Sequence, residues 1–208
     1  MKYVLQLSVL FFSVIIHEVA HGYIAYKRGD STAKQLGRLT LNPVSHIDIF
    51  GSILLPLVLL IANAPVFGWA KPVPVNPARL YKPKTDMLWV SLAGCAANFL
   101  LAITAALGML IIRNFATSDM SVLIPAYQIL QTILIINIVL PVLNLIPIPP
   151  LDGSRIVYYL LPTELAVKYD SISPYGFFII FALLFTGILW KIISPVIYFL
   201  IALLGGGI

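Results

Sequence analysis

The residues with the clearest chemical potential are His17, Glu18 and His21, which stand in the pattern H-E-x-x-H. On a helix, positions i and i+4 fall on one face, so both imidazoles can reach a single metal ion. The glutamate between them is placed to take a proton from a water molecule bound to that ion. Zinc suits this donor set, and it lowers the pKa of bound water to about 7. The pattern therefore predicts metal-assisted hydrolysis.

The surroundings of this motif favour function over coincidence. The motif lies in an apolar segment, Tyr3–Tyr26, that is long enough to cross a bilayer as a helix. An ionisable residue inside such a segment costs about 2.5–3.5 kcal/mol on insertion, so residues of this kind are functional by default. The alternative is that the three are incidental polar residues near a helix end. Against it, two of the chain's three histidines are used here.

A catalytic zinc site needs a third protein ligand, with water in the fourth position. The best candidate is Asp152, which follows an apolar segment and a proline-rich stretch, 147–150, that can bend back into the protein. An Asp-Gly pair is otherwise an ordinary turn. Together with the histidine motif, however, the aspartate favours a site built from His17, His21 and Asp152.

The composition predicts the kind of protein that must position these residues. Of 208 residues, 60% are hydrophobic and only 10% are charged, whereas a soluble domain has roughly 25% charged residues. We expect one domain, 1–208, that is an all-α polytopic membrane protein with about five to six membrane segments. Its catalytic core would cover about 3–155 and its C-terminal helices about 174–206. The net charge of +5 includes no basic run of the kind that binds nucleic acid.

Four apolar segments are long enough, or nearly so, to span about 30 Å of hydrocarbon. The last of them is too long for one straight helix, and we expect it to break near Lys191, Ser194 and Pro195. A fifth segment, Phe50–Ala62, is short, so a re-entrant element or a short membrane-associated β-hairpin is expected in this region. The four long segments are Tyr3–Tyr26, Met87–Ile112, Val122–Pro147 and Pro174–Leu204.

The motifs resemble those of the site-2 protease family of intramembrane zinc metalloproteases. The first family motif is H-E-x-x-H, and the second, Asn-x-x-Pro-x-Pro-x-Leu-Asp-Gly, matches Asn144 through Gly153. The stretch 93–98 is similar to the family's A-G-P-x-x-N motif, with Cys95 in place of the proline. The stretches 42–48 and 68–72 resemble a compact prokaryotic branch, and no PDZ domain is expected within these 208 residues.

The resemblance implies a role for each matched residue. His17, His21 and Asp152 would hold one zinc ion per chain, and Glu18 would be the general base. Asn144 would steady the scissile carbonyl or its oxyanion, a task suited to an amide donor. Asn98 would pack against or polarise the site and is counted with the substrate-binding residues. The substrate would be a transmembrane helix of another protein, cut in or near the bilayer.

Sharing one ion also constrains the orientation in the membrane. The histidine motif and Asp152 each lie near the C-terminal end of an apolar segment, so both ends must be on one side, and Met87–Ile112 must run the opposite way. The basic residues of 27–49 and 65–86 place that side toward the cytoplasm, and the family resemblance implies a prokaryotic cell membrane. The N-terminus would then be outside.

A helical substrate has no free backbone groups, so it must unwind near the cut. An edge strand could then hold it by β-addition. The candidates are Gly37–Leu41, where Leu39 and Leu41 would contact substrate, and Lys71–Val75, although ordinary loops remain the alternative.

Two other classes of protein stay open at this point. A metal transporter also lines its path with histidines and carboxylates, but it does not need Glu18. A catalytically inactive membrane scaffold would be expected to lose part of the set. His46 is the next candidate ligand, although a loop histidine beside a turn is more often structural. Oligomeric state and substrate identity are left open by the sequence.

Overall fold

The computed structural model describes residues 2–54, 57–58, 61, 70–115 and 123–205. Every regular element within these residues is a helix, and none of them forms a β-strand. Four helical stretches are long and apolar enough to cross a membrane: Val4–Lys27, Pro83–Asn114, Leu123–Asn144 and Thr163–Phe185. The predicted all-α membrane protein is confirmed at this level, but five to six membrane segments are not.

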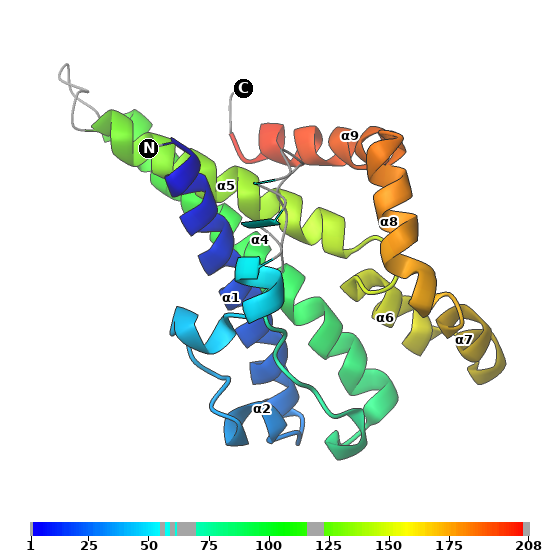
Figure 1. Ribbon diagram of the computed structural model, residues 1–208. Coiled ribbons are helices and arrows are strands. Elements are labelled where there is room, and N and C mark those ends of the chain that lie inside the picture. The colour runs from blue at the N-terminus through cyan, green and yellow to red at the C-terminus, as the bar shows by residue number, and fades with distance from the viewer. Residues whose placement is uncertain (1, 55–56, 59–60, 62–69, 116–122, 206–208) are drawn as a thin grey trace.

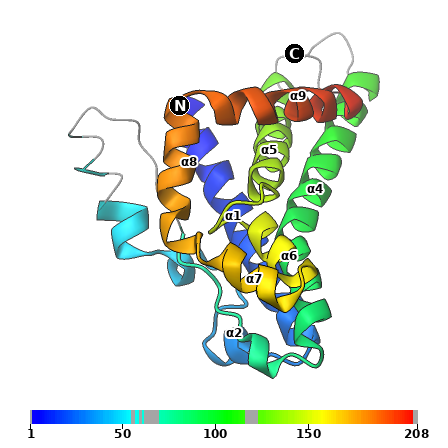
Figure 2. The same cartoon turned by 90° about the vertical axis from the view of Figure 1, so that its right-hand side faces the viewer.

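Three long helices form the centre of the molecule. They are α1 (Lys2–Lys27), α4 (Pro83–Phe115) and α5 (Leu123–Asn144). The helices lie beside one another, and α4 runs opposite to α1 and α5 (Figures 1 and 2). This is the arrangement that lets the end of α1 and the chain after α5 meet at one place.

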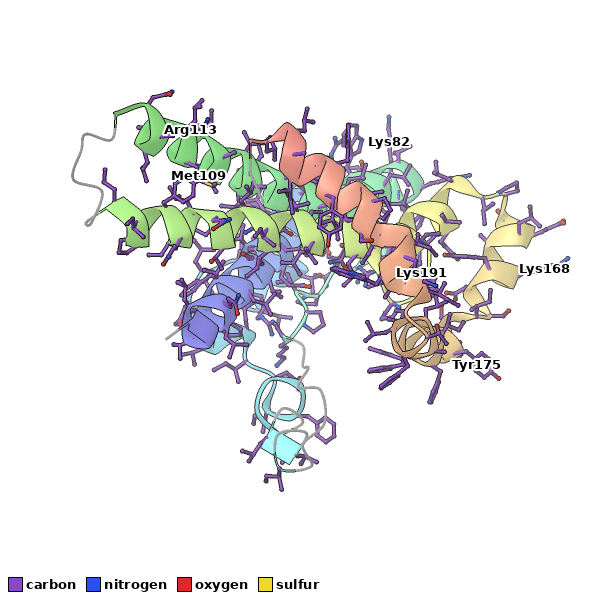
Figure 3. The ribbon with its side chains drawn as sticks, turned by 90° about the horizontal axis from the view of Figure 1, so that it is seen from above. Lys82, Met109, Arg113, Lys168, Tyr175 and Lys191 are labelled. Atoms are coloured by element: carbon purple, nitrogen blue, oxygen red, sulfur yellow. The ribbon has the colours of Figure 1, made fainter. Side chains whose placement is uncertain are left out.

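A second packing layer comes from α9 (Ile188–Leu203), which lies across the end of this bundle (Figure 2) and crosses α5 when seen from above (Figure 3). Leu189, Ile193, Ile197 and Ile201 recur every four residues and are buried against α4 and α5. Because α9 has 16 residues, it measures about 24 Å at 1.5 Å per residue, short of the roughly 30 Å of hydrocarbon. One face of α9 is thus buried on the bundle, whereas the opposite face exposes Trp190, Ile192, Val196 and Phe199.

The C-terminal region breaks into two helices as expected, but at a different place. The break falls at Thr186 and Gly187, between α8 (Gly176–Phe185) and α9, and not at Lys191–Pro195. Gly187 has a φ of 72°, a left-handed conformation that glycine adopts without steric cost and that commonly ends helices. Pro195 instead lies within α9, where it removes only one backbone donor.

Between α1 and α4 the chain forms short helices and one extended stretch. Residues 70–76, which we call the strap, run extended without pairing as a strand. No strand forms at Lys71–Val75 among the described residues, because the strap bonds to side chains and to the His46 carbonyl, and its prolines lack the backbone donor. Its pairing with a substrate chain stays a prediction. Gly37–Leu41 is also not a strand. The short helices are α2 (Thr32–Gln35), Pro43–His46, Ile49–Leu54 and Pro77–Arg79.

The predicted re-entrant segment, Phe50–Ala62, lies partly outside the described residues. What is described begins with a single π-helical turn at Ile49–Leu54. Beyond α5, the helices α6 (Asp152–Leu160) and α7 (Thr163–Asp170) lead into the short helix Ser173–Tyr175 and then α8.

Candidate active site

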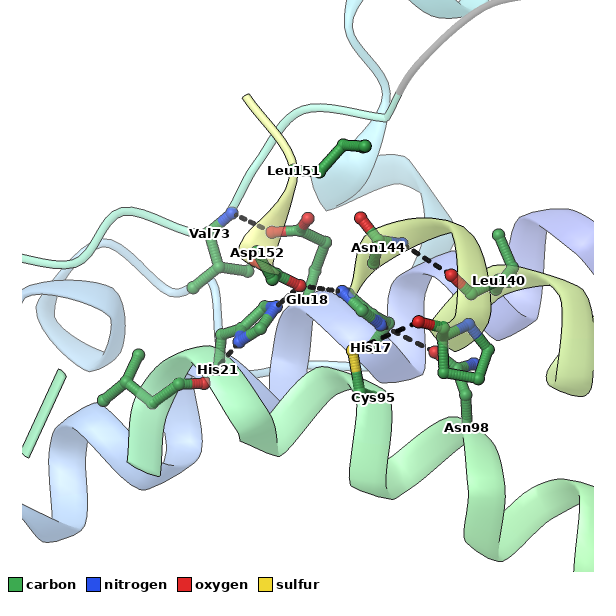
Figure 4. A network of polar contacts seen from close by, with 12 residues as sticks. His17, Glu18, His21, Val73, Cys95, Asn98, Leu140, Asn144, Leu151 and Asp152 are labelled. Carbon is green, nitrogen blue, oxygen red and sulfur yellow. Dashed lines mark hydrogen bonds and ion pairs between the residues drawn. The ribbon is translucent and has the colours of Figure 1, made fainter. Parts of the chain in front are cut away.

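The structure brings the two histidines and Asp152 together, although 131 residues separate His21 from Asp152 in sequence. His17 and His21 lie one turn apart on α1, and both are buried. Asp152 approaches from the start of α6, so that its Oδ2 lies 2.9 Å from His17 Nε2 and 3.1 Å from His21 Nε2 (Figure 4). The three side chains therefore converge on one point in the interior.

The chain before α6 is shaped to deliver Asp152. Leu151, which precedes the helix, is extended, with φ −66° and ψ 154°. Gly153 permits a close approach, because a Cβ there would lie 2.2 Å from the Leu145 carbonyl oxygen. The Asp-Gly pair is thus the point where α6 packs onto the end of the α5 segment, and it is not a simple exposed turn.

One face of α4 supports both histidines. Val90, Gly94 and Asn98 are spaced four residues apart and meet α1 at the imidazoles. His21 Nδ1–H donates to the Val90 carbonyl at 2.6 Å, and His17 Nδ1–H donates to Asn98 Oδ1 at 2.6 Å. Gly94 lies between them, where a Cβ would be 2.5 Å from His21 Nε2. These contacts resemble the outer partners that orient metal-bound histidines.

The hydrogen bonds allow a test of whether this site fits a metal ion. Because both Nδ1 atoms donate, each neutral imidazole directs a bare Nε2 lone pair at Asp152 Oδ2. Two lone pairs and a carboxylate oxygen converge there, and their ligand atoms lie within 4.8 Å of one another. Such a group is mutually repulsive unless a proton or a metal cation lies between its atoms. Two nitrogens and one oxygen, with a further position for water, suit a catalytic zinc ion.

Glu18 is half-buried beside this group and is held by the strap. The Val73 N–H donates to Glu18 Oε2 at 2.7 Å, which leaves Oε1 for another partner (Figure 4). Gly22 of α1 makes the approach possible, because a Cβ there would lie 2.5 Å from Val73 Cγ1 and 2.7 Å from Leu39 Cδ2. The strap thus holds the Glu18 carboxylate in place through the backbone N–H of Val73.

Two charged side chains hold the strap at its ends. Arg38 is buried and donates through Nη2 to the carbonyls of Lys71 and Pro72, at 2.7 and 3.2 Å. Asp30 accepts from the Asn76 N–H at 2.6 Å. Burial alone would raise the pKa of Asp30, but hydrogen bonds from Thr32 and from Asn76 hold that pKa below its usual range. Asp30 therefore stays an anionic acceptor for the strap.

Other predicted site residues take different places. Asn144 donates to the Leu140 carbonyl of its own helix at 3.0 Å. Asn98 is fully buried and contacts His17, and its role toward substrate stays a prediction. Leu39 packs on Gly22, whereas Leu41 is 57% exposed. His46 is buried, and its Nε2–H donates to the Thr40 carbonyl, away from the metal-ligand group.

Sequence reasoning missed several residues that support the site. Val73 acts through its backbone N–H, for which the residue type gives no signal, and Arg38 acts through its side chain on the backbone carbonyls of Lys71 and Pro72. Ser13 and Asn137 also belong to the polar surroundings of His17. Asn137 lies within an apolar helix, and a polar residue in such a helix could have been singled out on that ground alone.

Comparison with known proteins places this geometry in a family. A family model described as peptidase family M50 matches residues 5–187. YwhC of Bacillus subtilis is 39% identical over 197 residues, which cover 89% of this chain and 84% of YwhC. Rip2 of Mycolicibacterium smegmatis is 28% identical, covering 94% of this chain and 72% of its own. MJ0392 of Methanocaldococcus jannaschii is 26% identical over 91% of this chain and 46% of its own.

These three relatives are all described as zinc metalloproteases, YwhC and Rip2 as putative ones. No solved structure matches the chain significantly. The match to the family model runs over most of the chain and includes both α1 with its histidine motif and α6 with Asp152. The chain therefore belongs to peptidase family M50, the family of the site-2 proteases that its motifs resemble.

Proposed function

We propose that this protein is an intramembrane zinc metalloprotease that cuts transmembrane helices of other proteins. One zinc ion per chain is held by His17, His21 and Asp152. The observation that carries the proposal is the convergence of both Nε2 atoms on one Asp152 oxygen, with each Nδ1 engaged as a donor. The family and the relatives' descriptions support the same reaction. A transporter has no comparable use for Glu18 beside this group.

The residues around the ligands supply the rest of the reaction. Bound zinc lowers the pKa of water and polarises a carbonyl oxygen. Glu18 accepts a proton from the attacking water through Oε1, while the Val73 N–H keeps Oε2 in place. The proton then passes to the leaving amine. Asn144 has a second amide hydrogen beyond the one given to Leu140, and this donor steadies the oxyanion.

A groove beside the strap suits the unwound part of the substrate. It holds about 570 Å³ and is bounded by the strap on one side and by Pro149, Pro150 and α6 on another. Val73 belongs both to the groove wall and to the contact with Glu18. A substrate chain laid along the strap would therefore pass the general base. Leu41 is accessible to such a chain, and Leu39 lies with Val73 of the strap against Gly22 of α1.

The orientation follows from charge. The strap and the segments before and after it carry Arg28, Lys34, Arg38, Lys71 and Arg79, and such basic loops face the cytoplasm. The active site therefore opens toward the cytoplasmic side of a prokaryotic cell membrane. Water and the released fragment use that side.

Replacing Asp152 with alanine is expected to reduce bound zinc well below one per chain and to stop turnover. The reason is that two imidazoles alone leave the ion with too few protein ligands for a catalytic site. Metal analysis of purified protein and cleavage of a transmembrane reporter substrate measure the two effects. A chelator should inactivate the wild type, and added zinc should restore it.

Asp170→Ala is the matched control, because Asp170 is an exposed aspartate on α7 outside the metal-ligand group. This variant should keep its zinc. If Asp152→Ala binds zinc and cleaves as the wild type does, the ligand set proposed here is wrong and His46 becomes the next candidate.

Substrates that unwind more easily near the cut should be cleaved faster. A glycine in place of alanine costs a helix about 1 kcal/mol, equivalent to about fivefold more unwound chain. We expect a gain of that order in the initial rate for glycine next to the scissile bond, and a loss for leucine. The same glycine placed two turns from the cut should change little. Equal rates for all positions would exclude local unwinding as a requirement.

A further inference from the structure

A chain of buried polar side chains leads away from His17 into the apolar bundle. Ser13 on α1, Asn98 on α4 and Asn137 on α5 are each 3% exposed or less. They come from three helices and meet at one place. Polar groups this deep among membrane helices are costly unless paired, and they are functional by default.

The hydrogen bonds of the two asparagines are fully accounted for. Asn98 Nδ2 donates to the Ser13 carbonyl at 3.2 Å and to Asn137 Oδ1 at 2.7 Å. Asn137 Nδ2 donates to Ser13 Oγ at 2.8 Å and to the Ile133 carbonyl at 2.9 Å. Each amide nitrogen thus donates both of its hydrogens, and one of the two acceptors is a backbone carbonyl.

Those backbone carbonyls determine which way each amide faces, since a carbonyl can only accept. If Asn137 turned over, its oxygen would oppose the Ile133 carbonyl. If Asn98 turned over, its oxygen would oppose the Ser13 carbonyl, and its nitrogen would face His17 Nδ1. The contact between the two amides would be satisfied if both kept their present orientation or if both turned over, and the Ser13 and Ile133 carbonyls exclude the second case. Asn98 Oδ1 is therefore directed at His17.

The two histidines differ in how their tautomers are fixed. His21 donates to the Val90 backbone carbonyl, which needs no further support to act as an acceptor. His17 donates to a side-chain amide, whose two ends have opposite hydrogen-bonding character. An extra constraint is thus needed only at His17, and it is at His17 that Asn137 and Ser13 are found.

We infer that Asn137, together with Ser13, is a positioning residue that holds the Asn98 amide so that His17 keeps its proton on Nδ1 and presents Nε2 to the metal. This inference rests on the proposed zinc ligation by His17. Nothing in the chain requires Asn137 to contact zinc or substrate. It acts through Asn98 alone.

The test measures zinc affinity by competition with a chelator for four proteins: wild type, Asn137→Ala, Asn98→Ala and the double variant. Asn137→Ala should weaken zinc binding by about tenfold, the lower end of the effect of losing an outer partner of a metal-bound histidine. Asn98→Ala removes the amide through which Asn137 acts, so no acceptor is left there for Asn137 to orient toward His17. In the Asn98→Ala background, Asn137→Ala should therefore change zinc affinity by less than about twofold, a coupling that a double-mutant cycle isolates.

Three comparisons decide the outcome. Thr132→Ala removes an exposed hydroxyl from the same helix, bonded only within it, and should leave zinc affinity unchanged. His17→Ala should release zinc. If it keeps its zinc, the proposed ligand set is wrong, and that outcome is distinct from a failure of this inference. With His17→Ala behaving as expected, an equal loss from Asn137→Ala in both backgrounds would show that Asn137 is merely structural. No loss in either background would also overturn its positioning role.

Discussion

Glu18→Gln is expected to abolish peptide cleavage while about one zinc ion stays bound per chain. Glutamine keeps the shape of the side chain, and its amide oxygen can still accept from the Val73 N–H. It cannot take a proton from water, however, and general-base catalysis contributes typically about 10²–10⁴-fold. The ligands His17, His21 and Asp152 are untouched. Zinc analysis and cleavage of a transmembrane reporter, measured on the same preparation, give both quantities.

The chain offers a matched control for this change. Glu164 is its only other glutamate and is exposed on α7, so Glu164→Gln should cleave as the wild type does. Full activity of Glu18→Gln would remove Glu18 as the base. Loss of zinc from Glu18→Gln would instead make it part of the ligand set, contrary to the division of roles proposed here.

The sequence predicts those site residues whose side chains carry the chemistry. Two histidines at i and i+4 in an apolar helix, with an aspartate after a proline-rich stretch, indicate a shared metal site. The groups that support them are not predictable in the same way. The Val73 N–H and the Val90 carbonyl are backbone atoms of kinds that nearly every position carries, and only the fold selects them.

In the fold, likewise, the long helices are predictable from the sequence, whereas the position of the helix break and the partners of the strap are not. Hydropathy over about 20 residues predicts the long helices, because crossing the membrane demands length and apolar composition together. The break predicted at Pro195 falls at Gly187 instead, where the left-handed backbone ends α8, and α9 continues through Pro195 although a proline there removes a backbone donor and crowds the preceding turn. The strap has the extended conformation expected of a strand, yet it bonds mainly to side chains, with one backbone bond from the Lys71 N–H to the His46 carbonyl. The alternation of residue types in the sequence does not distinguish such a stretch from a strand.

Gly94→Ala is expected to remove zinc and to lower cleavage at least about a hundredfold, although Gly94 carries no side chain that could take part in the chemistry. In a helix interior this change normally stabilises by about 1 kcal/mol. At Gly94 the new Cβ would lie 2.5 Å from His21 Nε2 and 2.6 Å from His17 Nε2. Both imidazoles must then move, and a displacement of about 1 Å at such a site can cost about 10²-fold.

Gly108→Ala on the same helix separates this steric effect from a general effect of alanine in α4. A Cβ at Gly108 would meet only the end of the flexible Leu130 side chain, at 3.0 Å. Gly108→Ala should therefore keep its zinc and its activity, and it should melt at the wild-type temperature or slightly above. Gly94→Ala should keep its helical circular dichroism, because α4 itself gains helix propensity, while metal analysis shows the loss of zinc. If Gly94→Ala retained one zinc per chain and full cleavage, α4 would not lie against the histidines as described. The hydrogen bonds from the imidazoles to Val90 and Asn98 would then also be wrong.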